Sequence, residues 1–300
     1  TPTNGTGRTI IAAEIDLQSG GTIEADSDGF ASEAGPGAGT NYTWYSTSGG
    51  GYGGAGSDAD FGGSSPSLGG APYGTAASPT ALGSGGGQYD SSTGGSGGGA
   101  IKLSVSGVLT VNGTVSADGS AGSGADIYAG GSGGSIWITG SCTLKGTGKI
   151  SVDGGDSKTS GTNSGSGGGR IDISGITVAG STFITNGGTL SVLGGRSSDL
   201  YYGMAGTIKF PASFDLVVDN SGATGLKNLT LGVNVESGSV DETLYNFDSV
   251  TVAASSILTL SGNSKIVNGG TSGNPYGQGV TITASGMTIA GALSADSMGF

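Results

Sequence analysis

The sequence predicts an all-β protein, a parallel β-helix or a closely related β-solenoid that carries a glycine-rich, polyglycine-II-like insertion. A repeat of fixed length, strand-like alternation of apolar and small polar residues, and the absence of any long helical pattern support this fold class. Glycine makes up 68 of the 300 residues. It has no strict three-residue period, which excludes collagen. Strand motifs between the glycines argue against disorder.

The repeat is 35 residues long. Ile101, Ile136 and Ile171 each follow a glycine-rich run and are spaced 35 residues apart. The same spacing relates Leu109 to Leu144, Gly113 to Gly148, Val115 to Ile150, and Asp118 to Asp153. A unit of this size cannot bury its apolar face alone, so stacking of neighbouring units is expected to create the core.

Composition divides the chain into four segments. Residues 1–30 are expected to form the first rungs and a joining segment, and residues 31–100 form an insertion rich in glycine, serine and aromatic residues. Residues 101–200 hold the 35-residue repeats. Residues 201–300 have fewer glycine runs and longer strand signals, and they end at what looks like the start of another repeat. The insertion is expected to be either packed, with glycines allowing close backbone approach, or flexible.

The two ends resemble each other. Residues 21–30 (GTIEADSDGF) and 291–300 (GALSADSMGF) are identical at six of ten positions, and GRTIIA at 7–12 corresponds to GVTITA at 279–284. This favours continuation end to end, either between copies of the chain or between adjoining repeats of one longer chain, with chance similarity as the alternative. The expected joining residues are Thr9, Ile10, Ile11, Ile282, Ile289 and Phe300.

Residue chemistry argues against an enzyme. The chain has no histidine and a single cysteine, Cys142, which removes imidazole bases, internal disulfides and thiolate metal clusters. Cys142 lies on an expected strand, so a small buried residue is favoured over an intermolecular disulfide. Paired carboxylates can hydrolyse glycosides without histidine. The candidate pairs, all in glycine turns where aspartate is common for backbone reasons, are Asp26 with Asp28, Asp58 with Asp60, and Asp153 with Asp156.

The same turns could hold a structural calcium ion, because calcium binds carboxylate and carbonyl oxygens. The candidate ligands are Asp26, Asp28, Asp153 and Asp156. The alternative is that these are solvated turn carboxylates. No other cofactor is expected.

Two further sets of residues offer surface roles. Aromatic residues in the insertion would either pack or, if exposed, contact glycans: Tyr42, Trp44, Tyr45 and Tyr52. Four N-x-S/T sequons are candidate glycosylation sites if the protein is secreted: Asn4, Asn41, Asn112 and Asn228.

The formal net charge of −12 leaves no basic stripe of the kind that binds nucleic acid. No apolar run approaches the roughly 18 residues needed to span a bilayer. The isolated TIT at residues 281–283 lacks the regular threonine files of an ice-binding solenoid.

The glycine-rich motifs resemble a known class of sequences. SGGGAIKLSVSGVLTVNGTVSADG, GGSGGSIWITG and SGGGRIDISG are similar to glycine-rich repeats of very large extracellular and cell-surface β-solenoid proteins, adhesin-like in kind. The resemblance covers residues 82–173 well and the rest loosely. It implies an extracellular or cell-surface location and transfers no site residue. The expected function is a building unit of an extracellular fibre, filament or surface stalk, and the alternative is an adhesin that binds glycans.

Overall fold

The structure is a computed structural model, and it describes residues 7–42, 46–59, 67–124, 127–157, 162–197, 202–236, 239–262 and 279–295. The described residues form an all-β fold without helices. Among them, no helix is long and apolar enough to cross a membrane.

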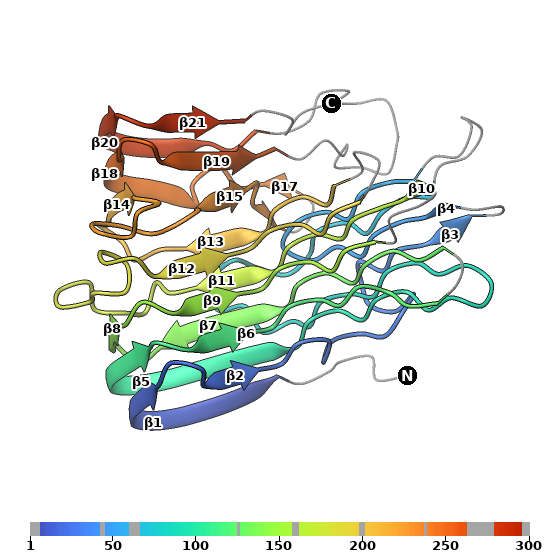
Figure 1. Ribbon diagram of the computed structural model, residues 1–300, viewed down its shortest axis with the longest axis horizontal. Helices are drawn as coiled ribbons and strands as arrows, with labels where there is room; N and C mark the ends of the chain where they lie inside the picture. The colour runs from blue at the N-terminus through green and yellow to red at the C-terminus, as the bar shows by residue number, and fades with distance from the viewer. Residues whose placement is uncertain are drawn as a thin grey trace.

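The N-terminal two thirds of the chain form two parallel sheets, in which strands from successive repeats lie one above the other (Figure 1). The first has the order β1 (Arg8–Leu17), β5 (Ala100–Val111), β7 (Ser135–Thr139), β11 (Arg170–Asp172) and β13 (Thr207–Lys209), with β8 (Thr143–Lys145) also beside β5. The second has the order β2 (Thr22–Glu24), β6 (Thr114–Ser116), β9 (Lys149–Ser151) and β12 (Thr189–Ser191). Four layers of the stack each combine a strand of the first sheet with a strand of the second: β1 with β2, β5 with β6, β7 with β9, and β11 with β12.

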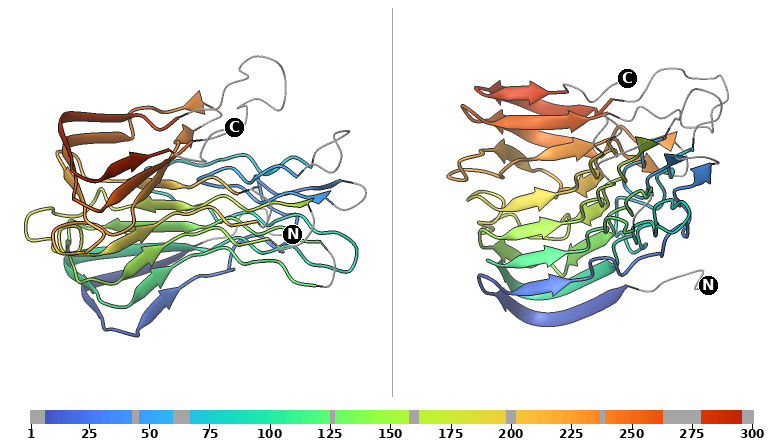
Figure 2. Two further views of the ribbon diagram at one scale, coloured as in Figure 1. Left: turned by 45° about the horizontal axis from the view of Figure 1, so that its top comes forward. Right: turned by 45° about the vertical axis from the view of Figure 1, so that its right-hand side comes forward.

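The same arrangement continues through the C-terminal third (Figure 2). One parallel sheet contains β14 (Asp215–Val218), β18 (Tyr245–Val252) and β20 (Ile282–Ile289), and another contains β15 (Thr230–Gly232), β19 (Ile257–Ser261) and β21 (Ala292–Ser294). Two small sheets lie apart from these: β3 (Asn41–Tyr42), β4 (Ser46–Thr47) and β10 (Thr162–Asn163), and the antiparallel pair β16 (Val235–Glu236) and β17 (Ser239–Val240).

Residues that are 35 positions apart in the sequence pair directly between neighbouring strands. Ile101 pairs with Ile136, and Ile136 pairs with Ile171, as the repeat predicts. A fourth member, Ile208, pairs with Ile171 after an interval of 37 residues. All four side chains are buried, so each layer adds one isoleucine to a continuous apolar column. This column is the core that single repeats could not make.

Strand alternation decides which side chains enter this core. In β5, the buried Ile101, Leu103 and Val105 alternate with the partly exposed Lys102 and Ser104. The second sheet faces it with a column that includes Val115, Ile150 and Leu190, which are also buried and paired. The core therefore lies between the two sheets and runs along the stack.

Glycine-rich segments without regular strands extend from one side of the stack (Figure 1). The segment at residues 165–169 shows how they associate. Gly167 donates to the carbonyl of Gly50 and accepts from the amide of Gly133, whereas Gly168 donates to Met204 and accepts from Gly53. A β-strand has neighbours on two sides only, but this segment bonds through its backbone to at least three other segments, at residues 50–53, 133 and 204.

Such contacts require glycine because the chains approach closely. A Cβ atom added at Gly133 would lie under 3.0 Å from backbone atoms of Val152 and Gly169, and one at Gly167 would meet the Gly54 backbone. The segment at residues 31–100 takes part in these contacts with residues that lie more than 100 positions away, such as Ser57 with Gly165. Its described residues therefore pack against the repeats.

Candidate functional site: the carboxylate ladder and the open ends

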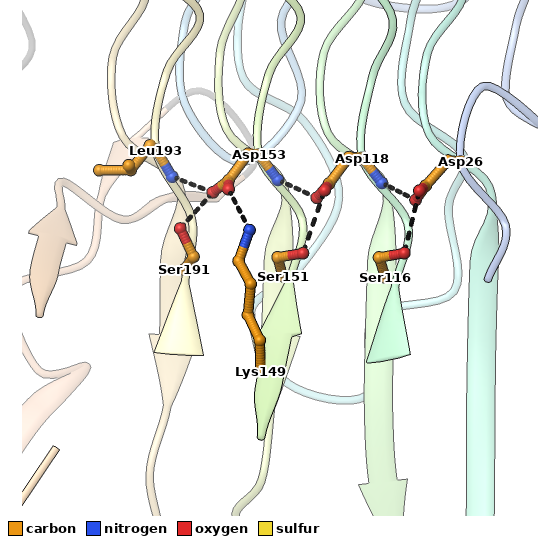
Figure 3. Close-up of polar contacts among 8 residues, drawn as sticks. All are labelled: Asp26, Ser116, Asp118, Lys149, Ser151, Asp153, Ser191 and Leu193. Carbon is orange, nitrogen blue, oxygen red and sulfur yellow. Dashed lines mark hydrogen bonds and ion pairs between the residues drawn. The ribbon is translucent and has the colours of Figure 1, made fainter. Parts of the chain in front are cut away.

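Three aspartates join successive layers by hydrogen bonds, and each lies just after a strand of the second sheet (Figure 3). The Asp26 carboxylate accepts hydrogen bonds from the Asp118 amide at 2.7 Å and the Ser116 hydroxyl at 3.0 Å. Asp118 in turn accepts from the Asp153 amide at 2.6 Å and the Ser151 hydroxyl at 3.0 Å. We call Asp26, Asp118 and Asp153 the carboxylate ladder.

The ladder ends at the next layer. Asp153 accepts from the Ser191 hydroxyl at 2.6 Å and the Leu193 amide at 2.8 Å. Leucine, which has no carboxylate, stands at the equivalent position 193, so the ladder goes no further. The other Asp153 oxygen contacts the Lys149 ammonium at 3.1 Å.

Local sequence explains the ladder. Each complete step has a Ser-x-Asp motif, in which serine ends a short strand and aspartate follows two residues later (SAD at 116–118 and SVD at 151–153). Side chains two positions apart point to the same side of an extended chain. The serine hydroxyl therefore lies on the same side as the aspartate side chain, and it bonds together with the aspartate backbone amide to the carboxylate of the preceding layer.

The electrostatics of the ladder are unfavourable at its centre. Burial, followed by the neighbouring Asp153 carboxylate and more weakly Asp26, raises the pKa of Asp118 to about 6. The Asp153 amide and the Lys149 ammonium oppose this rise. Above that pH the Asp118 carboxylate carries a negative charge that its surroundings disfavour.

The ladder occupies part of the expected calcium set. Asp26 and Asp153 use their oxygens for the hydrogen bonds above, and Asp156 accepts from the Arg196 amide at 2.7 Å. Asp28 is exposed, beside the ladder. No group of three or more carboxylate or thiol side chains in the described residues is arranged to hold a metal ion.

Asp58, from another of the expected carboxylate pairs, is also held in a structural contact. The Asp58 carboxylate accepts from the Gly69 amide at 2.7 Å, and Asp60 lies outside the described residues. Cys142 is a free, fully buried thiol, and burial raises its pKa. Asp58 therefore serves as a hydrogen-bonding group and Cys142 as a packing group.

The joining residues lie at opposite ends of the stack. β1 is the last strand of its sheet at one end, and β20 is the last strand at the other (Figure 1). Thr9 is exposed, Ile10 is 37% exposed and Ile11 is 80% exposed, whereas Ile282 is partly buried and Ile289 is 40% exposed. Phe300 lies outside the described residues.

Of the expected aromatic set, Tyr52 is the one whose side chain the structure describes, and it does not lie on the surface. Tyr52 is fully buried, its ring lies 4.8 Å from that of Tyr73, and its hydroxyl bonds to Ser135 at 2.7 Å. Tyr52 therefore packs inside the protein instead of facing a ligand. Tyr42 belongs to the short strand β3, and Trp44 and Tyr45 lie outside the described residues.

Of the sequons, Asn41, Asn112 and Asn228 are exposed. The Asn41 amide donates to the Gln88 carbonyl at 2.9 Å, and Asn228 has a positive φ of 49°. Asn4 lies outside the described residues.

Sequence reasoning missed a buried arginine. Arg170 is fully buried, and all its donors are satisfied by uncharged acceptors. Its guanidinium donates to the carbonyls of Tyr73 and Val235 and to the side chains of Thr207 and Asn234, at 2.8–3.1 Å. It thereby joins the glycine-rich insertion, the first sheet and the C-terminal third.

A polar groove of about 610 Å³ lies close to this arginine. Lys209, Glu236, Asp241 and Asp248 contribute its charged groups. Glu236 and Asp241 each accept a hydrogen bond from the Asn234 amide, at 3.3 and 3.2 Å. The Asn234 oxygen accepts from Arg170, so this side of the groove belongs to the same network.

Comparisons with protein-family models, with curated proteins and with solved structures found no match to this chain.

Proposed function

We propose that this chain is a non-enzymatic building unit of an extracellular fibre, filament or surface stalk, formed as a β-solenoid that is extended end to end. The observation that carries the proposal is the register of the layers. In the first sheet, equivalent buried isoleucines pair directly from one layer to the next, at intervals of 35 or 37 residues. Such a stack grows along one axis without changing its cross-section.

The hydrogen-bonding pattern supports a mechanical role. Hydrogen bonds connect the layers in three ways: through the parallel strands, through the carboxylate ladder and through the Arg170 network. The glycine segments bond in several directions, as polyglycine II helices do, and would form a second support along the same axis. A load applied along the stack would be shared among many backbone hydrogen bonds.

The chemistry of the residues supports the absence of catalysis. Histidine is missing, and the described aspartates singled out above as pairs, apart from the exposed Asp28, accept hydrogen bonds from the protein itself. The net charge of −12 would keep long assemblies soluble and limit lateral association. An extracellular or cell-surface location rests on the resemblance of the glycine-rich motifs.

Electron microscopy of the native material and of the 300-residue chain tests the proposal, together with a denaturing gel of the native protein. Filaments from the isolated chain, with a native band near the mass of one unit, would support assembly of separate copies. A very large native band and fibrous native material would support a tandem array of such units. Compact native particles without any fibre would contradict the structural role.

A further inference from the structure

The two outermost strands of the stack place their inward-facing residues at the same spacing. In β1, Arg8 pairs with the buried Ile101, and the next four positions that pair with buried residues of β5 have intervals of two, three and two residues: Ile10, Ala12, Ile15 and Leu17. In β20, the positions that pair with buried residues of β18 have the same intervals: Ile282, Ala284, Met287 and Ile289.

This shared spacing makes β1 a better match for β20 than for its own neighbour. The pairing of β1 with β5 needs a register shift between Ala12 and Glu14, because β5 has one more residue at that point. The pairing of β18 with β20 keeps one offset of 37 residues throughout, from Tyr245–Ile282 to Val252–Ile289. A β1 strand laid against β20 would likewise need no shift.

The core is open to solvent at both ends. Ile10 is 37% exposed at one end, and Met287, Ile289 and Leu293 are 40–47% exposed at the other, although all four occupy core-facing positions. Equivalent residues inside the stack, such as Leu103 and Val250, are fully buried. Another layer at either end would cover these side chains and gain their hydrophobic burial.

Charge also favours contact between the two ends. The β20 sequence, ITASGMTI, has no charged residue, whereas exposed edge strands usually carry charges that prevent pairing. β1 carries Arg8, Glu14 and Asp16. In the shared register these carboxylates would lie opposite Gly286 and Thr288, so no like charges would meet.

We propose that the outer edge of β1 binds the outer edge of β20 in a second copy of this chain, as parallel strands in the register Ile10–Ile282, Ala12–Ala284, Ile15–Met287 and Leu17–Ile289. Ile23 of β2 then covers Leu293 of β21 in the second sheet. Because the two edges differ, the contact is head to tail, and because each copy continues the stack along its own axis, the assembly stays open and forms a filament. The inference rests on the proposed function and specifies its junction.

Site-directed crosslinking tests the register in the full 300-residue chain. Ile11 and Thr283 face outward and would be neighbours across the junction, so the double variant I11C/T283C should give a ladder of oligomers with a thiol linker of about 10 Å, twice the strand spacing. The matched control is I11C/T288C, whose thiols would be about 17 Å apart along the strands. The unmodified chain, with buried Cys142, gives the background.

The crosslinking outcomes separate the junction from the proposed function. A ladder from I11C/T283C and only background from the control supports the register. Equal products from both variants, or background from both at high protein concentration, overturns it. If fibres are seen by electron microscopy in that second case, the structural role stands and the junction is different. If the native material is also compact, the structural role fails as well.

A pair of lysine variants tests the buried face of the junction. M287K would place an unpaired ammonium group between the apolar ends, and we expect it to weaken self-association about 100-fold in sedimentation velocity. T288K differs by one position but points outward, opposite Asp16, and should leave association intact or strengthen it. Met287 is half exposed in the single copy, so thermal melts should show both variants folded. Equal association of the two variants would contradict the proposal.

Discussion

The Asp118 carboxylate accepts a hydrogen bond of 2.6 Å from the backbone amide of Asp153, its own counterpart one repeat later. Asp118 and Asp153 therefore each play two parts, since each donates its backbone amide to the carboxylate of the preceding layer and offers its own carboxylate to the next layer. Burial and the carboxylates of Asp153 and Asp26 disfavour the charged form of Asp118 and raise its pKa, and the Lys149 ammonium partly opposes this rise. The central step of the ladder is thus sensitive to pH.

We expect D118N to be more stable than the unmodified chain above pH 6. The folded-state pKa of Asp118, about 6, exceeds its ordinary value of 3.8. The folded state therefore holds the proton more tightly, and this stabilisation is complete below pH 4 and is lost as the pH rises through 6. Asparagine keeps an acceptor for the Asp153 amide and removes the charge, which should add about 1–3 kcal/mol to the free energy of unfolding at pH 7.5.

Urea unfolding of both proteins between pH 4 and 8 measures this effect. The stability difference should grow with pH and level off above about pH 7. D28N is the matched control, because it makes the same change in charge at an exposed residue beside the ladder. A difference that is independent of pH, or one that D28N reproduces, would contradict the assignment.

Replacing Arg170 with methionine should strongly destabilise the fold. The change leaves buried acceptors on Tyr73, Asn234 and Val235 without their donor, and an unsatisfied buried group costs about 1–3 kcal/mol. We expect a loss of more than about 3 kcal/mol in urea unfolding. R196M removes an exposed arginine and should change stability by less than about 0.5 kcal/mol. Similar effects of the two substitutions would show that the Arg170 network does not hold the three segments together.

Alanine at Gly133 should disrupt the glycine bundle. The added Cβ would meet the backbones of Val152 and Gly169, which cannot move as a side chain would. Overpacking of this kind costs about 1–3 kcal/mol or more. A Cβ added at Gly279 would meet nothing within 4 Å beyond its own chain neighbours, so G279A serves as the control. Thermal unfolding should separate the two variants clearly, and equal melting temperatures would mean that the close approach is not required.

The repeat period predicted the strand register because the burial of side chains determines that register. Ile101, Ile136 and Ile171 are large and apolar, and a slip of one residue would expose every one of them. The interval to Ile208 was missed because two extra residues lie in the connection, and a search at a fixed period does not find it. The equivalence of Asp118 and Asp153 was visible in the sequence, but the bond between them was not, because it joins a side chain to a backbone amide.

The glycine segments and Arg170 were beyond sequence reasoning for a physical reason. Glycine has no side chain to favour one register or one neighbour, so composition indicated close packing and left the partners undetermined. The acceptors of Arg170 include the carbonyls of Tyr73 and Val235, which lie 97 and 65 residues away. Backbone carbonyls carry no residue-specific signal, and the sequence around Arg170 therefore looked like one more repeat.

Substitutions at Tyr52 should separate packing from ligand contact in the aromatic segment. Y52F removes the hydrogen bond to Ser135, whose hydroxyl still donates to the Ala81 carbonyl, and should cost about 1 kcal/mol. Y52A also removes the ring that lies beside Tyr73 and 5.6 Å from the Arg170 guanidinium carbon, and should cost about 3–5 kcal/mol. Urea unfolding and a glycan-array measurement on both variants check this expectation. Full stability in Y52A combined with a specific loss of glycan binding would overturn the packing role and favour the adhesin alternative.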